Sequence, residues 1–406
     1  MKQNSTNPLN IIVIVAALGY FVDIYDLILF SIVRVPSLLA LGITQDNLLN
    51  EGAKLINRQM LGMLTGGLLW GIMGDKKGRV SVLFGSILLY SIANIFNAYV
   101  TTITQYQWLR FIAGVGLAGE LGAGITLVNE TMTKEQRGYG TMIVVSFGVL
   151  GAVLANIIAK FGWQNAYITG GIMGLVLLLM RIGVYESGMY HHVKKSNVSR
   201  GDFFMLFKNA KRFVRYLSCI TIGIPIWYMI GILVTFSPEF AKELNIKGVQ
   251  AGTAVMYFYL GTSFGDFMSG YLSQIFKTRK KILLLYLIIT VITVPVYLFT
   301  SNISSGIFYF ICSILGVAAG YWAVFVTIAS EQFGTNLRST VTTTVPNFVR
   351  GSLVLLTILL DLFRKTFSIS LVNSALFVGI IAIGIAFISL MGMHETFGKD
   401  LDYVEE

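Results

Sequence analysis

The sequence predicts an all-α membrane protein whose twelve transmembrane helices form two six-helix halves. Three observations support this prediction. Of the 406 residues, 55% are hydrophobic and only 12% are charged, whereas about 25% are charged in soluble domains. The apolar residues gather in twelve segments, and about 20 such residues cross a bilayer as a helix. Five identities recur at a single offset between the two halves of the chain.

Polar residues, glycine or proline bound each apolar segment. The segments cover residues 10–33, 56–74, 80–100, 106–128, 139–159, 164–183, 216–236, 249–275, 282–300, 304–328, 340–362 and 369–391. We therefore predict an N-terminal bundle over 1–183, a cytoplasmic linker over 184–215, a C-terminal bundle over 216–391 and a cytoplasmic tail over 392–406.

An internal repeat supports this division. Ala118, Gly119, Thr126, Glu130 and Arg137 each recur 201 positions later. Transporters that rock two halves around a site near the bilayer midplane are built from such repeats. The repeat therefore favours a transporter.

Lysine and arginine are concentrated on one side of the predicted membrane. They occur in the loops after the second, fourth and eighth segments and in the linker, while the opposite side has scattered cations such as Lys54 and Lys160. Cytoplasmic loops carry this excess, so we expect both termini to be cytoplasmic and the protein to lie in an inner membrane. The net charge of +10 then reflects orientation, and no nucleic-acid partner is expected.

The sequence contains no visible nucleophile–base set, metal cluster or phosphate-binding loop. We therefore expect no enzyme activity, no catalytic residue, no metal and no cofactor. Cys219 and Cys312 both lie in apolar segments and are expected to be reduced. The expected partners are a small-molecule substrate, a coupling ion and the lipid bilayer, with the protein acting as a monomer.

Two carboxylates interrupt the first apolar segment. Asp23 and Asp26 are three residues apart, so they share one helix face. An acid at the bilayer centre costs about 2.5–3.5 kcal/mol on insertion scales, which makes such a residue a candidate functional site. The alternative places both acids at a helix end in water, but the apolar run continues from Leu27 to Val33.

The loop after the second segment carries a motif. Residues 71–79 read GIMGDKKGR, which resembles the Gly-x-x-x-Asp-Arg/Lys-x-Gly-Arg signature of the major facilitator superfamily. Gly71 allows close helix approach and Gly78 a tight turn. Asp75, Lys76 and Arg79 supply charges for a cytoplasmic gate. The second-half copy has Gln274 where the signature has Asp, which indicates a weaker latch there.

Three further stretches are similar to the sugar-porter and organic-ion branches of that superfamily. Glu186-Ser187 is followed by Gly188 in place of proline, residues 331–340 resemble the loop after helix ten, and residues 395–402 resemble the C-terminal ending. The resemblance implies the major facilitator fold. The pairs Glu130–Arg137 and Glu331–Arg338 are expected to act as gate salt bridges.

The resemblance also implies sites for proton coupling. In related proton-coupled members, an acid of helix one pairs with an arginine of helix four, and Asp26 and Arg110 match these positions. We expect Asp26, with Asp23 beside it, to carry the proton. Glu120 lies deeper in the fourth segment and is a second candidate. The structural alternatives are a snorkelling Arg110 and a Glu120 packed against neighbouring helices.

Several polar and aromatic residues are candidates for binding the substrate. Arg350, with Asn347 nearby, lies inside the eleventh segment, and a cation within a span usually faces a cavity. Together with Arg110 it suggests a carboxylate on the substrate. Pro225 interrupts the seventh segment. The aromatic candidates for the cavity are Tyr25, Trp227, Tyr228, Tyr257, Tyr321 and Trp322, although such residues often face lipid or core.

The sequence thus predicts a secondary active transporter, a proton-coupled symporter that takes up an organic acid or another carboxylate-bearing metabolite by alternating access. Sodium remains an alternative coupling ion. A proton-driven exporter of a siderophore, drug or metabolite is the main alternative. The fifth segment lacks the proline typical of exporters of the superfamily, which favours uptake. A non-transporting membrane sensor is a further alternative, disfavoured by the short termini.

Overall fold

The structure is a computed structural model of the whole chain. It describes residues 11–120, 122, 125, 128, 132–133, 136–180, 203–399 and 403–405. Within these ranges, the side chains of Ile11, Ile12, Asp75, Arg79, Val80, Arg137 and Ser339 are outside the description. Glu130 also falls outside it, so the expected Glu130–Arg137 pair and the charges of Asp75 and Arg79 stay predictions.

All six apolar segments of the first half contain a helix, as predicted. The helices are α1 (Ile11–Ala40), α2 (Leu48–Lys77), α3 (Arg79–Asn97), α4 (Ile103–Leu117), α6 (Arg137–Gly148) with α7 (Gly151–Ala159), and α8 (Trp163–Met180). The fifth segment is thus broken between Gly148 and Gly151. At that break Gly151 packs against the α1 backbone, because an added Cβ would lie 2.0 Å from the Phe21 carbonyl oxygen.

The second half also follows the predicted segments, with more interruptions. Its helices are α10 (Ala210–Thr221), α11 (Ile224–Tyr228) with a π-helical turn (Met229–Val234), α12 (Ser237–Glu243), α13 (Ala251–Ile275), α14 (Lys280–Phe299), α15 (Ser305–Ala319), α16 (Trp322–Glu331), α17 (Thr335–Asp361) and α18 (Leu371–Gly392). Pro225 lies in the first turn of α11, so the expected break in the seventh segment is confirmed. The first of these helices begins at Ala210 rather than at residue 216.

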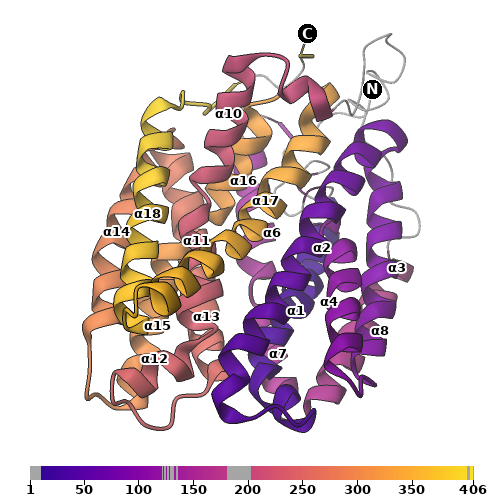
Figure 1. Cartoon of the computed structure of the whole chain (residues 1–406). Helices are drawn as coiled ribbons and strands as arrows, with labels where there is room; N and C mark the ends of the chain where they lie inside the picture. Colours follow the sequence, from indigo (N-terminus) through magenta and orange to yellow (C-terminus); the bar gives the residue numbers. More distant parts are fainter. Residues whose placement is uncertain are drawn as a thin grey trace.

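Helix length and apolar composition indicate which helices can span a membrane. Among the described residues, eight helical stretches are long and apolar enough to cross a membrane. The first half lies to the right in Figure 1 and the second half to the left, with the helices of each running roughly side by side. The result is a helical bundle in which one hydrophobic core runs through both halves.

The two halves meet along two pairs of helices. α2 packs along α17, and α6 and α7 pack along α13. Small residues bring the backbones together: a Cβ added to Gly71 would lie 3.2 Å from the Cα of Thr340. Asn57 of α2 also donates to Thr357 of α17 at 3.0 Å. Cross-half contacts therefore occur near both ends of the bundle.

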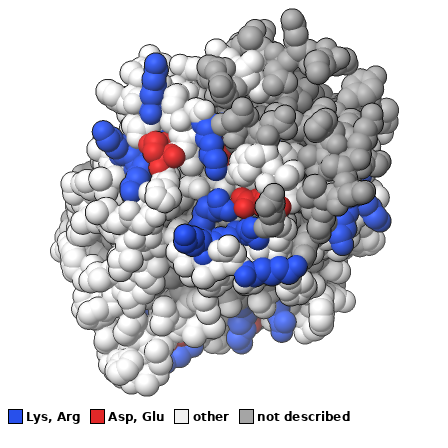
Figure 2. Space-filling model, turned by 90° about the horizontal axis from the view of Figure 1, so that it is seen from above, with Lys and Arg blue, Asp and Glu red and all other residues white. Residues whose placement is uncertain are grey.

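Basic side chains gather at the end that carries the termini. Figure 2 views this end and shows clusters of lysine and arginine. Exposed cations here include Lys208 and Lys211 around the start of α10, and Lys277 and Lys281 around the start of α14. α12, with Lys242, lies at the opposite end (Figure 1). The charge asymmetry expected from the sequence is therefore present in three dimensions.

Candidate functional site

The structure brings Asp23 and Arg350 together at the junction of the halves. Oδ2 of Asp23 in α1 lies 3.7 Å from Nη2 of Arg350 in α17. The two side chains are 0% and 1% exposed. Pro346 lies within α17, one turn before Arg350. Because one partner comes from each half, any rocking movement between the halves must change this ion pair.

Aromatic side chains surround the guanidinium of Arg350. Its Cζ lies 5.7 Å from the ring centre of Trp322, and its Nη1 donates to Oδ1 of Asn347 at 3.4 Å. Tyr20 of α1 and Tyr259 of α13 lie within electrostatic range of Arg350. Among the described residues, Nε and Nη2 of Arg350 and Nε1 of Trp322 have no hydrogen-bond partner. Nε of Arg350 and Nε1 of Trp322 are thus available to a ligand, whereas Nη2 already pairs with Asp23.

Asp266 completes this group, and the sequence analysis missed it. It lies in α13 and is fully buried. Tyr20 and Tyr259 lie within electrostatic range of it. Its Oδ1 accepts from the backbone N–H of Ala323 at 2.9 Å, at the start of α16, where a carboxylate favours the helix dipole. Its Oδ2 has no hydrogen-bond partner within the described ranges. A single acid inside the apolar run Ala251–Ile275 is the signal that could have found it.

We refer to Tyr20, Asp23, Tyr259, Asp266, Trp322 and Arg350 together as the junction cluster. It combines one fixed cation, two acids and three aromatic rings from both halves. Such a set can hold a small anion with an apolar, planar body, because arginine binds carboxylates and aromatic walls take up rings. Asn347 extends it, because its Nδ2 donates to the carbonyl of Ala118 in the other half at 2.7 Å.

A second polar group lies inside the first half. Asp26 is fully buried and packs against α8, where a Cβ added to Gly170 would lie 1.9 Å from its Oδ1. Arg110 of α4 and Asn94 of α3 lie within electrostatic range of Asp26. Neither oxygen of Asp26 has a hydrogen-bond partner among the described residues. We refer to Asp26, Gln59, Asn94, Arg110 and Tyr167 as the bundle cluster.

Arg110 contacts Gln59 in this structure, and its expected pairing with Asp26 stays a prediction. Its Nη2 donates to Oε1 of Gln59 in α2, and its Cζ lies 5.7 Å from the ring centre of Tyr167. Asp26 and Arg110 are both fully buried, and Arg110 lies within electrostatic range of Asp26. Glu120 is buried beyond the end of α4.

The remaining aromatic candidates divide into buried and peripheral residues. The hydroxyls of Tyr25, Tyr228 and Tyr321 donate to backbone carbonyls of their own halves at 2.7–3.0 Å. Trp227 is buried in the core. Tyr257 stacks on Tyr309 at a ring-centre distance of 5.6 Å and is 37% exposed. The expectation that Tyr257 lines the substrate site therefore finds no support in its contacts and stays a prediction.

The predicted gate is partly rearranged. Glu331 pairs with Arg279 at 3.2 Å and accepts from Thr396 at 2.7 Å. Arg338, fully buried, donates to the carbonyl of Phe333 at 3.4 Å. The expected Glu331–Arg338 pair stays a prediction. Gly78 has φ of 105°, a conformation that favours glycine, so its role in the turn is confirmed.

The C-terminal tail docks onto the same end. Glu395 accepts from the side chain of Thr278 and from the backbone N–H groups of Arg279 and Lys280. Partial burial raises the pKa of Glu395, but these hydrogen bonds outweigh it and hold that pKa below the ordinary value. The tail thus fastens the loop between α13 and α14.

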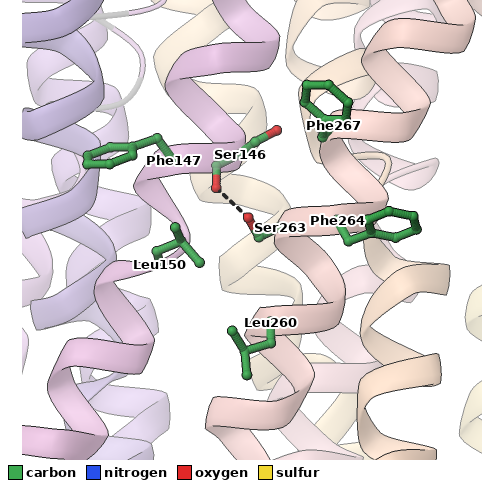
Figure 3. A pocket seen from close by; sticks show the side chains of 7 residues that line it. All are labelled: Ser146, Phe147, Leu150, Leu260, Ser263, Phe264 and Phe267. Carbon is green, nitrogen blue, oxygen red and sulfur yellow. Dashed lines mark hydrogen bonds between the residues drawn. The ribbon is translucent and has the colours of Figure 1, made fainter.

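A hollow of about 420 Å³ lies between α6, α7 and α13, on the flank of the bundle (Figure 3). Its wall is mainly apolar, with Phe147, Leu150, Leu260, Phe264 and Phe267. Ser263 donates to the carbonyl of Ser146 at 2.7 Å across it. An apolar wall without a charged group does not suit a small anion, in contrast to the junction cluster with its buried arginine.

Comparisons with known proteins agree with this architecture. The family model of the Major Facilitator Superfamily matches residues 16–351. A Bacillus subtilis protein described as a candidate niacin/nicotinamide transporter is 27% identical, over 83% of this chain and 84% of its own length. The 3-(3-hydroxy-phenyl)propionate transporter of Escherichia coli is 27% identical, over 56% of this chain and 57% of its own.

A solved structure is similar over nearly the whole chain. It is a proton:xylose symporter of the same superfamily, bound to 6-bromo-6-deoxy-D-glucose, with a TM-score of 0.74 and 16% identity. The alignment covers 96% of this chain and 97% of that one. At this identity the likeness concerns the fold alone, which is the twelve-helix fold predicted from the sequence.

Proposed function

The chain belongs to the Major Facilitator Superfamily, and from this premise we propose that it is a proton-coupled symporter for a small organic acid. The transport of small organic metabolites agrees with the names of its relatives. We place the substrate at the junction cluster and the proton at the bundle cluster. The cycle is alternating access, in which the two halves rock around the junction cluster.

The observation that carries the proposal is the buried guanidinium of Arg350. Its Nε and Nη2 lack hydrogen-bond partners among the described residues, although the group is 1% exposed. Unpaired buried donors are costly, and a substrate carboxylate would satisfy them. Asp23, 3.7 Å away, neutralises the arginine while the site is empty and would be displaced or protonated when the substrate binds.

The aromatic members of the junction cluster narrow the substrate class. Trp322 lies beside Arg350, and Tyr20 and Tyr259 approach from the two halves. A carboxylate attached to a planar ring would use the cation and the rings together. The relatives support a ring-bearing substrate: 3-(3-hydroxy-phenyl)propionate, named for one of them, is a ring-bearing carboxylic acid, and niacin/nicotinamide, named for another, are such an acid and its amide.

Asp26 is our proposed proton carrier. Its oxygens are buried without a hydrogen-bond donor among the described residues, beside Arg110. A buried charge is costly unless it is paired, so a movement that separates Asp26 from Arg110, or brings them together, would couple the position of the halves to proton uptake and release. Glu120 remains a second candidate.

The membrane orientation follows from the charge asymmetry. We propose that the basic end seen in Figure 2, with both termini, faces the cytoplasm, and that the protein lies in the inner membrane. Substrate would then enter from the end that carries α12. The gate at the cytoplasmic end would include Gly71, Lys76, Gly78, Glu331 and Arg338, with Asp75 and Arg79.

Proteoliposomes provide the test. We expect the reconstituted protein to accumulate radiolabelled nicotinate when the outside is acidified, and to ignore nicotinamide, which has the same ring with an amide in place of the carboxylate. Equal handling of the two compounds would contradict the carboxylate-binding role of Arg350. Accumulation driven by a sodium gradient alone would show that the coupling ion is sodium and not the proton. Accumulation only in inside-out vesicles would establish the exporter instead.

A further inference from the structure

An arginine outside both clusters joins the two halves at the end opposite the termini. Arg34, in the last part of α1, is fully buried. Its Nη1 lies 2.8 Å from Oε1 of Glu239 in α12, and its Nη2 donates to Oε2 at 2.9 Å. The two residues come from different halves. This two-pronged contact is the arrangement in which arginine binds a carboxylate most strongly.

The first half holds Arg34 in place independently of Glu239. Nη1 donates to the carbonyl of Leu48 at the start of α2, at 3.2 Å. Gly52 of α2 leaves space for the side chain, because a Cβ there would lie 2.6 Å from Cδ of Arg34. These contacts stay with the first half when the halves separate. The guanidinium would therefore keep its position after Glu239 has left.

The contacts between Arg34 and the second half would break when the two halves separate at this end. Besides Glu239, the carbonyl of Thr235 accepts from Nη2 at 3.3 Å, and the ring of Phe236 lies 4.9 Å from Cζ. The Glu239 side chain is 20% exposed and that of Arg34 is 0% exposed. Solvent and solutes can thus reach the carboxylate of the pair before they reach the guanidinium.

The helix that carries Glu239 borders a hollow with basic side chains in its wall. The hollow has a volume of about 370 Å³ and is lined in part by Lys242 and Lys247. Concave surfaces lined by one sign of charge raise the local concentration of counter-ions. Small anions would therefore be concentrated next to the Arg34–Glu239 pair.

We propose that Arg34 and Glu239 form the outer gate, and that Arg34 is a docking site for a small monocarboxylate. When the gate opens, the carboxylate of the incoming molecule takes the place of Glu239 on the guanidinium. The inference rests on the proposed orientation and uptake function. It adds a first carboxylate-binding arginine on the route to Arg350.

A cysteine pair can report the state of this gate. The hydroxyls of Ser31 in α1 and Thr235, in the turn before α12, are 3.2 Å apart across the halves, so the double variant S31C/T235C should form a disulfide when the gate is closed. The native Cys219 and Cys312 are buried. We would measure the rate of cross-linking in full-length protein in proteoliposomes, in an Arg350→Gln background that removes the proposed central site.

Four results are expected. Glu239→Gln slows cross-linking about tenfold without ligand, because the gate loses its charge pair. External nicotinate slows cross-linking several-fold with Glu239 intact, and nicotinamide has no effect. Arg34→Lys abolishes the nicotinate effect, because an ammonium cannot bind a carboxylate through two parallel hydrogen bonds. Lys54→Gln, which breaks an exposed ion pair with Glu51 at the same end, leaves the rate unchanged.

An unchanged rate in Glu239→Gln would overturn the gate, and equal effects of nicotinate and nicotinamide would overturn the docking site. All cross-linking variants carry Arg350→Gln, so nicotinate cannot act on the gate through Arg350. A slower rate with nicotinate would therefore support binding at Arg34, whether or not Arg350 takes part in transport. The opposite result is also informative. If nicotinate transport depends on Arg350 but nicotinate does not change the cross-linking rate, the docking site at Arg34 is overturned and the proposed transport function stands.

Discussion

Asp23 and Asp26 lie three residues apart on α1, yet they belong to different parts of the molecule. Asp23 faces Arg350 in the other half, whereas Asp26 faces α8, α3 and α4 of its own half. The contacts of Asp23 change whenever the halves move relative to each other. The contacts of Asp26 change only when the first half itself rearranges.

This difference separates two tasks along a single helix. A residue at the junction can sense whether substrate joins the halves, and a residue inside one bundle can hold a proton away from the substrate. We therefore expect variants of the two clusters to have distinct effects on binding and on coupling.

The largest effect is expected from Arg350→Gln. It removes the cation of the junction cluster and leaves Asp23 buried beside a neutral side chain. Hydrogen bonds to charged groups contribute about 1.5–3 kcal/mol, so nicotinate binding should weaken about 10- to 100-fold. Isothermal titration calorimetry would measure this loss. The control Arg364→Gln removes an exposed arginine beside Asp361 and should bind normally; equal affinities of the two variants would refute the role of Arg350.

Asp26→Asn should separate coupling from binding. The amide has nearly the same shape as the carboxylate but cannot carry the proton, so accumulation driven by a pH gradient should fall at least tenfold. Exchange of internal for external nicotinate should continue, because the junction cluster is intact. Asp361→Asn, at the exposed end of α17, is the matched control. Undiminished accumulation in Asp26→Asn would place the proton elsewhere.

The sequence was sufficient to identify the twelve segments, the buried acids of α1 and Arg350, because charges inside apolar runs are visible without a structure. It could not assign partners. The pairing of Asp26 with Arg110 was implied by the family resemblance, and the approach of Gly170 to Asp26 could not be foreseen because it depends on how α8 packs against α1. Arg34 lies near a segment end, where a cation appears ordinary until Glu239, 205 residues away, is seen to bind it.

Gly170→Ala tests the packing of Asp26 with a smaller expected effect. The added methyl group would lie 1.9 Å from Oδ1 of Asp26 and 2.9 Å from the Tyr25 ring, so Asp26 must shift. Overpacking typically costs about 1–3 kcal/mol. We expect a lower melting temperature and a several-fold loss of proton-driven accumulation, with unchanged nicotinate affinity. Gly384→Ala meets no atom within 4 Å and should change none of these; a weaker affinity in Gly170→Ala would show that the clusters are not separable.

Glu395→Gln should have the smallest effect, because it removes a charge that belongs to neither cluster. Hydrogen bonds lower the pKa of Glu395 in the folded protein. The charged form therefore stabilises the fold above the ordinary carboxyl pKa of about 4.3, and this contribution is lost as the pH falls through the lowered value. The residue is about half exposed, so its contribution should stay below about 1 kcal/mol. Thermal unfolding should show the variant slightly less stable than wild type at pH 7 and equal to it at the acidic end of the scan, with nicotinate binding and accumulation unchanged. If Glu395→Gln instead reduced nicotinate accumulation, the C-terminal tail would take part in the transport cycle together with the two clusters.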